Sequence, residues 1–333
     1  MRSLTFAIAL TAISAAPQLA HSDNRAALVV YTYDSFVSDW GPGPAVEAAF
    51  EETCACDLQL VAAGDGAAIM SRLKLEGSRS DADVVLGLDT MLTADAAADG
   101  LIAPHGRSGL QFDMPVTWDD PHFLPYDWGY FAFVYDSTKI TAPPVNFEAL
   151  IASDLDIVIQ DPRSSTPGLG LMMWVKQAYG DRAGEIWTGL APRIVTVTKG
   201  WSEAYGMFLE GEADMVLSYT TSPAYHIIAE EDETKKAATF DEGHLMQIEV
   251  AGILANTDQP DLAQAFLDFM VSDRFQSIIP TTNWMYPAIT PTAGLPEAFA
   301  RPVPDDRALL VPASEAAATR KVALAEWLAA LSK

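Results

Sequence analysis

The sequence lacks the residue patterns by which common enzymes are recognised. It has only two cysteines and five histidines, and the histidines are scattered along the chain. No His-Glu-x-x-His, Gly-x-Ser-x-Gly or Walker pattern occurs, so the usual signatures of zinc peptidases, serine hydrolases and P-loop nucleotidases are missing. No nucleophile, base and orienting group can be assembled from the remaining residues. These absences favour a binding protein over an enzyme.

The two cysteines, Cys54 and Cys56, are separated by a single residue. In an oxidising compartment they can pair, although a Cys-x-Cys bridge closes a very small loop. A small local disulfide is therefore the first interpretation, and two free thiols are the second. A metal site is the third, because no further ligands lie nearby at a suitable spacing.

Basic residues are scarce, since 20 Lys and Arg stand against 45 Asp and Glu and give a formal net charge of −25. Such a surface repels nucleic acid and anionic lipid, so neither is expected as a partner. The charge is compatible with a cationic ligand. It is equally compatible with a role in solubility alone, because bulk charge does not locate a site.

Long apolar runs are confined to the N-terminus. Arg2 precedes an apolar run over residues 4–16, and a polar HSDNR segment follows it. This arrangement is typical of a secretory signal, and the run is short for a membrane span. We therefore expect a signal peptide over residues 1–22 and export to the periplasm. No other stretch approaches the roughly 18 apolar residues of a spanning helix, so the mature chain is expected to be soluble.

The N-terminal third alternates between short apolar runs and helical patterns. Strands are predicted at 27–32, 58–63 and 83–88, with helices at 43–53 and 67–75. Near-continuous apolar strands separated by helices indicate a parallel sheet that is covered on both faces.

The same alternation resumes after an irregular segment over residues 101–125. Further strands are predicted at 129–135, 156–159 and 193–197, and further helices at 170–179, 202–210, 260–271 and 313–331. Two α/β sets without a flexible linker imply two lobes joined by crossing strands. We expect residues 23–125 with about 250–333 to form lobe 1, and about 126–249 to form lobe 2. Open α/β sheets bind ligands beyond the carboxyl ends of their strands, so the site is expected in the cleft between the lobes.

The loops after the predicted strands are rich in aromatic residues. Tyr33, Trp201, Tyr219 and Tyr225 lie in such loops, and Trp284 follows in a Pro-flanked loop. Aromatic faces can sandwich a flat heterocycle and attract a cation, each contact being worth about 0.5–2 kcal/mol. A carboxylate next to glycine, at Asp65-Gly66, could accept hydrogen bonds from an amino group or neutralise a positive ring.

A hydroxyl-rich helix start follows the strand predicted at 156–159. Ser164, Ser165 and Thr166 precede Pro167 and Gly168. Hydroxyls and free backbone N–H groups at a helix N-terminus form an anion site, and an ordinary N-cap is the alternative interpretation.

Long strings of unusual sequence extend over nearly the whole mature chain. They are VYTYDSFVSDWGPGP (30–44), DVVLGLD (83–89), PYDWGYFAFVYD (125–136), QDPRSSTPGLGL (160–171), TVTKGWSEAYGMFLEGEADMVLSYTTSPAYH (196–226) and IPTTNWMYP (279–287). In these strings the chain resembles the periplasmic thiamine-binding proteins of bacterial ABC importers. The resemblance implies a two-lobed type II periplasmic binding protein fold that closes on thiamine, its monophosphate or its diphosphate in the interlobe cleft. It also implies a protein without a cofactor, expected here as a monomer, that delivers its ligand to a membrane permease.

The resemblance carries ligand contacts over to matched positions. The residues so implied are Tyr33, Asp65, Gly66, Ser165, Thr166, Trp201, Tyr219, Thr220, Thr221, Ser222, Tyr225 and Trp284. Ser165 and Thr166 would serve best at a phosphate, and the aromatic residues would form the walls.

Two other functions stay open at this point. An iron or phosphonate binder of the same fold is one, because Tyr219 and Tyr225 could supply phenolates to iron. An extracytoplasmic hydrolase of thiamine or of a phosphate ester is the other. Thiamine-degrading enzymes of this fold use a nucleophilic cysteine in the cleft, but Cys54 and Cys56 are expected at the opposite end of the sheet.

Overall fold

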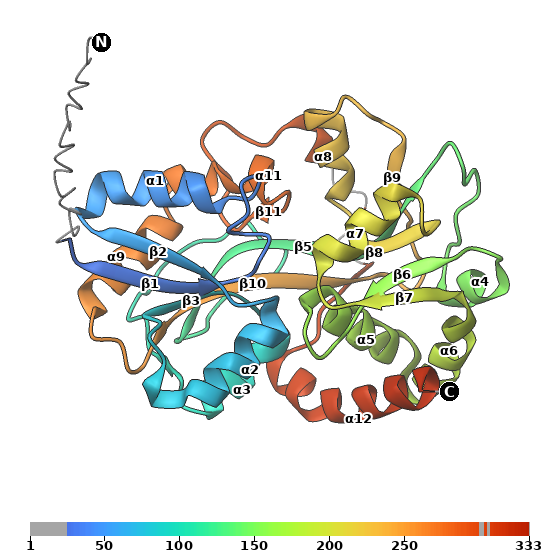
Figure 1. Ribbon diagram of the computed structural model, residues 1–333, viewed down its shortest axis with the longest axis horizontal. Coiled ribbons are helices and arrows are strands. Elements are labelled where there is room, and N and C mark those ends of the chain that lie inside the picture. The colour runs from blue at the N-terminus through green and yellow to red at the C-terminus, as the bar shows by residue number, and fades with distance from the viewer. Residues whose placement is uncertain (1–24, 300–302, 305–306, 333) are drawn as a thin grey trace, which may run out of the picture.

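The computed structural model describes residues 25–299, 303–304 and 307–332, which Figure 1 shows in colour. The predicted signal peptide lies outside these ranges. Within them, no helix combines the length and the apolar character needed to cross a membrane.

The first half of the chain forms the parallel sheet that its sequence predicts. The three strands pair in the order β2-β1-β3, and every residue of β3 is buried. Figure 1 shows α1 on one face of this sheet and α2 with α3 on the other. The elements are β1 (Ala27–Thr32), α1 (Gly43–Cys54), β2 (Asp57–Ala62), α2 (Gly66–Glu76), β3 (Val84–Asp89) and α3 (Thr90–Ala98).

Two long strands, β5 (Phe123–Asp136) and β10 (His244–Leu254), connect the halves. They pair antiparallel with each other, β10 also pairs with β3, and β5 also pairs with β8 of the second half. The sequence predicted only residues 129–135 of β5 and no strand at β10. The expected crossing strands are therefore present, but β5 is longer than its pattern indicated and β10 was not predicted.

The second half repeats the α/β arrangement. Its strands follow β5 in the order β8-β6-β7, and β6 is parallel to both of its neighbours. The elements are α4 (Phe147–Ala152), β6 (Ile157–Gln160), α5 (Thr166–Tyr179), α6 (Ala183–Leu190), β7 (Ile194–Thr198), α7 (Trp201–Glu210), β8 (Met215–Tyr219) and α8 (Ser222–Ala229).

Further elements flank the sheets. They are β4 (Ile102–Ala103), β9 (Lys235–Ala237), β11 (Tyr286–Pro287), β12 (Ala308–Leu309), α9 (Pro260–Met270), α10 (Asp273–Gln276), α11 (Ile279–Thr282) and the single 3-10 turns η1 (Gly77–Arg79), η2 (Gly180–Arg182), η3 (Ala191–Arg193) and η4 (Glu297–Phe299).

The C-terminal helix α12 (Ala313–Leu331) touches both halves of the molecule. Arg320 donates from Nη1 to the backbone oxygen of Met91 in α3 over 2.7 Å. Lys176 in α5 pairs with Glu326 over 2.8 Å. The helix therefore packs across the boundary between the two sheets, and its bounds match the prediction.

The two cysteines form a disulfide between Cys54 and Cys56, which confirms the first interpretation of the sequence. They lie at the end of α1 and directly before β2, and no free cysteine remains among the described residues.

Close packing at one glycine of α5 gives a test of this fold. A methyl group added at Gly170 would overlap the ring of Phe131 in β5, whereas one added at Gly206 in α7 would meet nothing within 4 Å. We expect Gly170→Ala to lower the free energy of unfolding by about 1–3 kcal/mol, because the core must shift. Gly206→Ala, as the control, should raise it by about 0.5–1 kcal/mol. Denaturant unfolding of the ligand-free protein measures both, and equal shifts would contradict the packing at Phe131.

Candidate functional site

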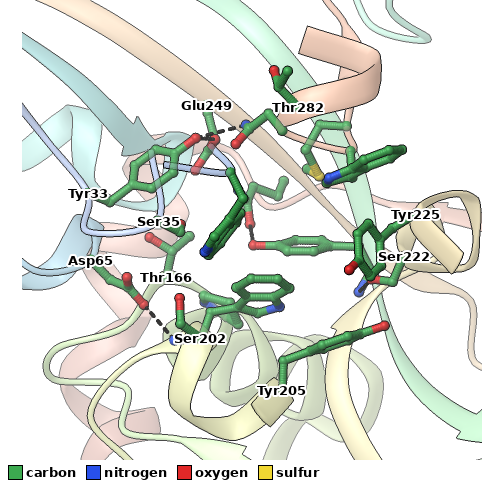
Figure 2. A pocket seen from close by; sticks show the side chains of 18 of the residues that line it. Tyr33, Ser35, Asp65, Thr166, Ser202, Tyr205, Ser222, Tyr225, Glu249 and Thr282 are labelled. Atoms are coloured by element: carbon green, nitrogen blue, oxygen red, sulfur yellow. Dashed lines mark hydrogen bonds between the residues drawn. The ribbon is translucent and has the colours of Figure 1, made fainter. Parts of the chain in front are cut away.

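A cavity of about 480 Å³ lies where loops of both halves meet. Its walls come from the carboxyl ends of the strands, as Tyr33 follows β1, Asp65 follows β2 and Thr166 follows β6. Figure 2 shows Tyr33 and Asp65 on one side of the cavity, with Tyr205 and Tyr225 on the other. The site therefore lies at the position that the sequence predicted for a ligand.

Two pairs of aromatic rings form much of the wall. Trp201 is the first residue of α7, and Tyr205 lies one turn later on the same face, where the rings stack at 5.0 Å and 25°. Tyr225 of α8 meets Trp284 edge to face, with ring centroids 5.2 Å apart. Trp284 has a φ of 58°, a left-handed conformation that is unfavourable for a bulky residue. Such strain is concentrated at functional sites.

Asp65 lies where three helices begin. It is the N-cap residue of α2, and its Oδ2 accepts from the Ser165 hydroxyl (2.7 Å) at the N-cap of α5. The same oxygen accepts from the backbone N–H of Trp201 (3.2 Å), the first residue of α7. Burial raises the pKa of Asp65 to about 6, although these hydrogen bonds favour the charged form. The contacts join the first half of the chain to the second.

A second acidic group lies on the crossing strands. Glu249 of β10 and Asp127 of β5 are register partners, and Glu249 lines the cavity. The hydroxyls of Tyr33 (3.0 Å) and Tyr126 (2.8 Å) donate to Oε2 of Glu249, and Asn283 donates to Oδ2 of Asp127 (2.6 Å). Burial raises the pKa of Glu249 to about 7, and burial beside Glu249 raises that of Asp127 well above its ordinary range. The pair therefore retains a proton near neutral pH.

Among the described residues, the cavity wall carries acidic side chains and no basic ones. Asp65 and Glu249 face the space, and no Lys or Arg occurs among the described residues that line it. Gln247 adds a polar group, since its Oε1 accepts from Tyr219 (2.8 Å) while its buried Nε2 has no partner among the described residues. A flat, positively charged ligand with a hydrogen-bond acceptor matches this wall.

The structure brings most of the predicted site residues together. Those that line the cavity are Tyr33, Asp65, Gly66, Thr166, Trp201, Tyr219, Ser222, Tyr225 and Trp284. Whether each of them contacts a ligand stays a prediction.

Three predicted residues do not line the cavity. Ser165 is fully buried, and its hydroxyl is committed to Asp65. Thr220 and Thr221 are buried behind the wall, where the backbone N–H of Thr220 donates to Tyr130 over 2.9 Å. The helix start at Ser165 was predicted to bind an anion. In the structure the Ser165 hydroxyl instead donates to the carboxylate of Asp65.

Other wall residues were not predicted. They include Ser35, Trp40, Tyr205, Gln247, Glu249 and Asn283. Tyr205 had a usable signal, because it lies four residues after Trp201 on a predicted helix. Gln247 and Glu249 had none, because no strand was predicted at β10.

Comparisons with known proteins agree with this geometry. Residues 42–277 match the family described as bacterial extracellular solute-binding protein. The chain belongs to this family. It is 51% identical over 308 residues to the thiamine-binding periplasmic protein of Escherichia coli (strain K12), covering 92% of this chain and 94% of the relative. It is 49% identical over 333 residues to the protein of the same name from Brucella abortus, covering 99% and 98%.

Solved structures extend the likeness to three dimensions. A periplasmic thiamin binding protein superposes with a TM-score of 0.89 at 50% identity, covering 96% of this chain and 100% of that one. A ferric binding protein from Campylobacter jejuni gives a TM-score of 0.73 at 18% identity, and that likeness concerns the fold alone. The predicted α/β, two-lobed type II fold is confirmed. The expectation of a family member that binds a solute, rather than an enzyme, is also confirmed by these relatives.

The hydrogen bond at Asp65 makes a testable prediction. Ser165→Ala removes a donor to the charged carboxylate, so the pKa of Asp65 should rise above 6 by about one unit or more. The control is Ser164→Ala, because the Ser164 hydroxyl donates to the backbone of Lys199 (2.7 Å) and not to Asp65. Carboxyl ¹³C titration by NMR measures the pKa in each variant. An unchanged pKa in Ser165→Ala would contradict the contact.

Proposed function

We propose that this chain is a periplasmic binding protein that captures thiamine and delivers it to the permease of an ABC importer. The observation that carries the proposal is the likeness, near half identity and along nearly the whole chain, to proteins named for thiamine binding. The anionic, aromatic cavity supports it independently, because its chemistry suits the two rings of thiamine.

Each part of thiamine has a matching surface. The thiazolium ring is a permanent cation, suited to the Trp201 face and to the carboxyl of Glu249. The aminopyrimidine is flat and neutral near pH 7, suited to stacking on the face of Tyr225 or of Trp284, which meet each other edge to face. We assign the free Nε2 of Gln247 as a donor to a ligand acceptor.

Thiamine monophosphate and diphosphate are proposed as further, weaker ligands. Phosphates carry negative charge, and the described wall offers them no Lys or Arg. The backbone start of α5 lies beside the carboxylate of Asp65, which repels an anion there. We therefore expect the affinity to fall from thiamine to its monophosphate and again to its diphosphate.

Export and delivery complete the proposal. Family membership implies a small-molecule ligand and an ABC transporter as partner. We propose that the segment 1–22 directs export and is removed. The mature protein would act as a monomer in which lobe 1 (23–125 with about 250–333) and lobe 2 (about 126–249) close on the ligand.

Iron is the less favoured ligand. It would require ionised phenolates, but burial and the charges of Glu249 and Asp65 raise the pKa of Tyr219 well above its ordinary value. The Tyr225 hydroxyl donates to Glu230 over 2.9 Å. A hydrolase that uses a cysteine nucleophile is also disfavoured, because Cys54 and Cys56 are joined to each other.

Titration calorimetry with thiamine, its monophosphate and its diphosphate tests the proposed ligand. We expect heat with all three and the tightest binding for thiamine. No binding of any of the three at concentrations that detect micromolar affinity would reject the function. Equal affinities for the three ligands would contradict only the predicted repulsion between the phosphates and the acidic wall.

Loss of one ring tests the aromatic wall. Trp201→Ala should weaken thiamine binding by about 1–3 kcal/mol, because a stacked face is removed. Trp201→Phe keeps an aromatic face but loses the hydrogen bond from Nε1 to the Ser218 hydroxyl (2.8 Å). Its loss of affinity should therefore be smaller than that of Trp201→Ala. Calorimetry gives both values, and an unchanged affinity in Trp201→Ala would remove this ring from the site.

The buried carboxyls predict how binding depends on pH. Glu249, with a pKa of about 7, and Asp65, at about 6, become negative as the pH rises, and a cation binds the negative form better. Thiamine affinity should therefore rise between about pH 6 and 8, by at most about tenfold per pH unit for one released proton. Glu249→Gln should flatten the profile. A profile that falls with pH, or that the variant leaves unchanged, would contradict the assignment.

A further inference from the structure

A histidine that does not face the cavity lies behind two of its walls. His226 of α8 is fully buried, and it is absent from the cavity lining. Its ring stacks on Tyr205 at 5.9 Å and 21°, and it meets Tyr225 edge to face at 4.9 Å. Both of those tyrosines line the cavity, as Figure 2 shows.

Hydrogen bonds join the two tyrosines through this histidine. The Tyr205 hydroxyl lies 2.8 Å from Nε2 of His226, and Nδ1 of His226 lies 2.6 Å from Oε2 of Glu230. The other oxygen of Glu230 accepts from the Tyr225 hydroxyl over 2.9 Å. The chain Tyr205–His226–Glu230–Tyr225 thus runs from α7 to the end of α8 and holds both hydroxyls away from the cavity.

The donors and acceptors of these hydrogen bonds can be assigned. Burial raises the pKa of Glu230, but hydrogen bonds from His226 and Tyr225 outweigh it, so the pKa lies below its usual range. Glu230 is therefore an acceptor on both oxygens, and Nδ1 of His226 carries the proton. Burial raises the pKa of Tyr205, whose hydroxyl stays protonated and donates to Nε2. Every partner is satisfied when Nδ1–H of His226 donates to Glu230 and Nε2 accepts from the Tyr205 hydroxyl.

The same groups are poorly suited to a metal ion. His226, Glu230 and Asp232 offer ligand atoms within 4.8 Å of one another. Both nitrogens of His226 are already engaged by protein groups, however. Asp232 accepts from the backbone N–H of Thr234 (2.7 Å) and pairs with Lys235 (3.0 Å), whose positive charge opposes a cation. The arrangement is that of an internal network.

We propose that His226 is a positioning residue of the binding site. With Glu230 it clamps the hydroxyls of Tyr205 and Tyr225, so that α7 and α8 present their rings as one rigid surface to a flat cationic ligand. The inference rests on the proposed function for the identity of the ligand. It goes beyond that function in assigning a role to two groups outside the cavity wall.

The clamp reaches both aromatic pairs. Tyr205 supports the face of Trp201, and Tyr225 supports the edge of Trp284. A ring that is fixed before the ligand arrives loses less conformational freedom on binding, which improves affinity without a new contact. Breaking the chain should therefore weaken binding even though no ligand contact is removed.

Three variants and a control test the clamp. His226→Phe fills the space but removes both hydrogen bonds, and Glu230→Leu removes the acceptor. Glu230→Gln keeps an amide that can accept from His226 and bond to Tyr225, so it should rescue most of the function. The control is Glu231→Leu, because Glu231 is the exposed neighbouring residue. The side chain of Glu230 is itself 41% exposed, so its variants are expected to fold even if His226→Phe does not.

Calorimetry with thiamine gives the first readout. We expect Kd to rise about tenfold or more in His226→Phe and Glu230→Leu, and to change little in Glu230→Gln and Glu231→Leu. The double variant Tyr225→Phe with Glu230→Leu should lose no more affinity for thiamine than Glu230→Leu alone, because both residues act through the same row of hydrogen bonds. A Kd within twofold of the parent protein in Glu230→Leu, with folding intact, would overturn the proposal, as would additive losses in the double variant.

NMR of tyrosine labelled with ¹³C at Cζ gives a second readout that needs no ligand, because the Cζ shift responds to the hydrogen bond of the hydroxyl. In Glu230→Leu the Cζ signal of Tyr225 should move, since the hydroxyl loses its acceptor. In Glu230→Gln it should stay close to its position in the parent protein. If the parent protein fails to bind thiamine, the proposed function is lost, but these signals still decide whether the hydroxyls are held. An unchanged Cζ shift of Tyr225 in Glu230→Leu would reject the clamp.

Discussion

The antiparallel pairing of β5 with β10 is the constraint on which the binding site depends. Both strands are buried along nearly their whole length, and together they join the parallel strands of the first half to those of the second. The strands on either side end at the same central space, where their following loops meet. Asp127 and Glu249 are register partners on this pair, so the crossing also determines where the buried acids lie.

These buried acids are costly without a positive partner. An uncompensated carboxylate in a low-dielectric site is unfavourable, and the raised pKa values of Asp127 and Glu249 express that cost as a retained proton. A fold under no functional constraint would be as stable with apolar side chains there. Buried acids without a positive partner are expected at a site that binds a cation. The charge of the bound cation then offsets the cost of removing the carboxylates from water. The aromatic faces around these acids also attract a cation.

Much of the fold could be predicted from the sequence, because most of its elements have a clear period. The strand at 27–32 and the helix at 313–331 match the structure at both ends. β10 was missed because Gln247 and Glu249 interrupt its apolar run. Because β10 was missed, its two polar wall residues, Gln247 and Glu249, were missed as well. Tyr205, in contrast, follows from helical spacing once Trp201 is placed in the site.

Ser165 illustrates a different limit, because its pattern correctly predicts a helix start but does not identify the partner of its hydroxyl. Asp65 lies a hundred residues earlier in the chain, and only the folded structure brings its carboxylate to the beginnings of α2, α5 and α7. The positive ends of three helices favour one negative group at that point. Asp65 supplies that charge and accepts the backbone N–H of Trp201 and the hydroxyl of Ser165, so a carboxylate of the protein lies where an anion was expected. The remaining field of the cavity is then set by Glu249 and the aromatic faces, which select for positive charge in the ligand.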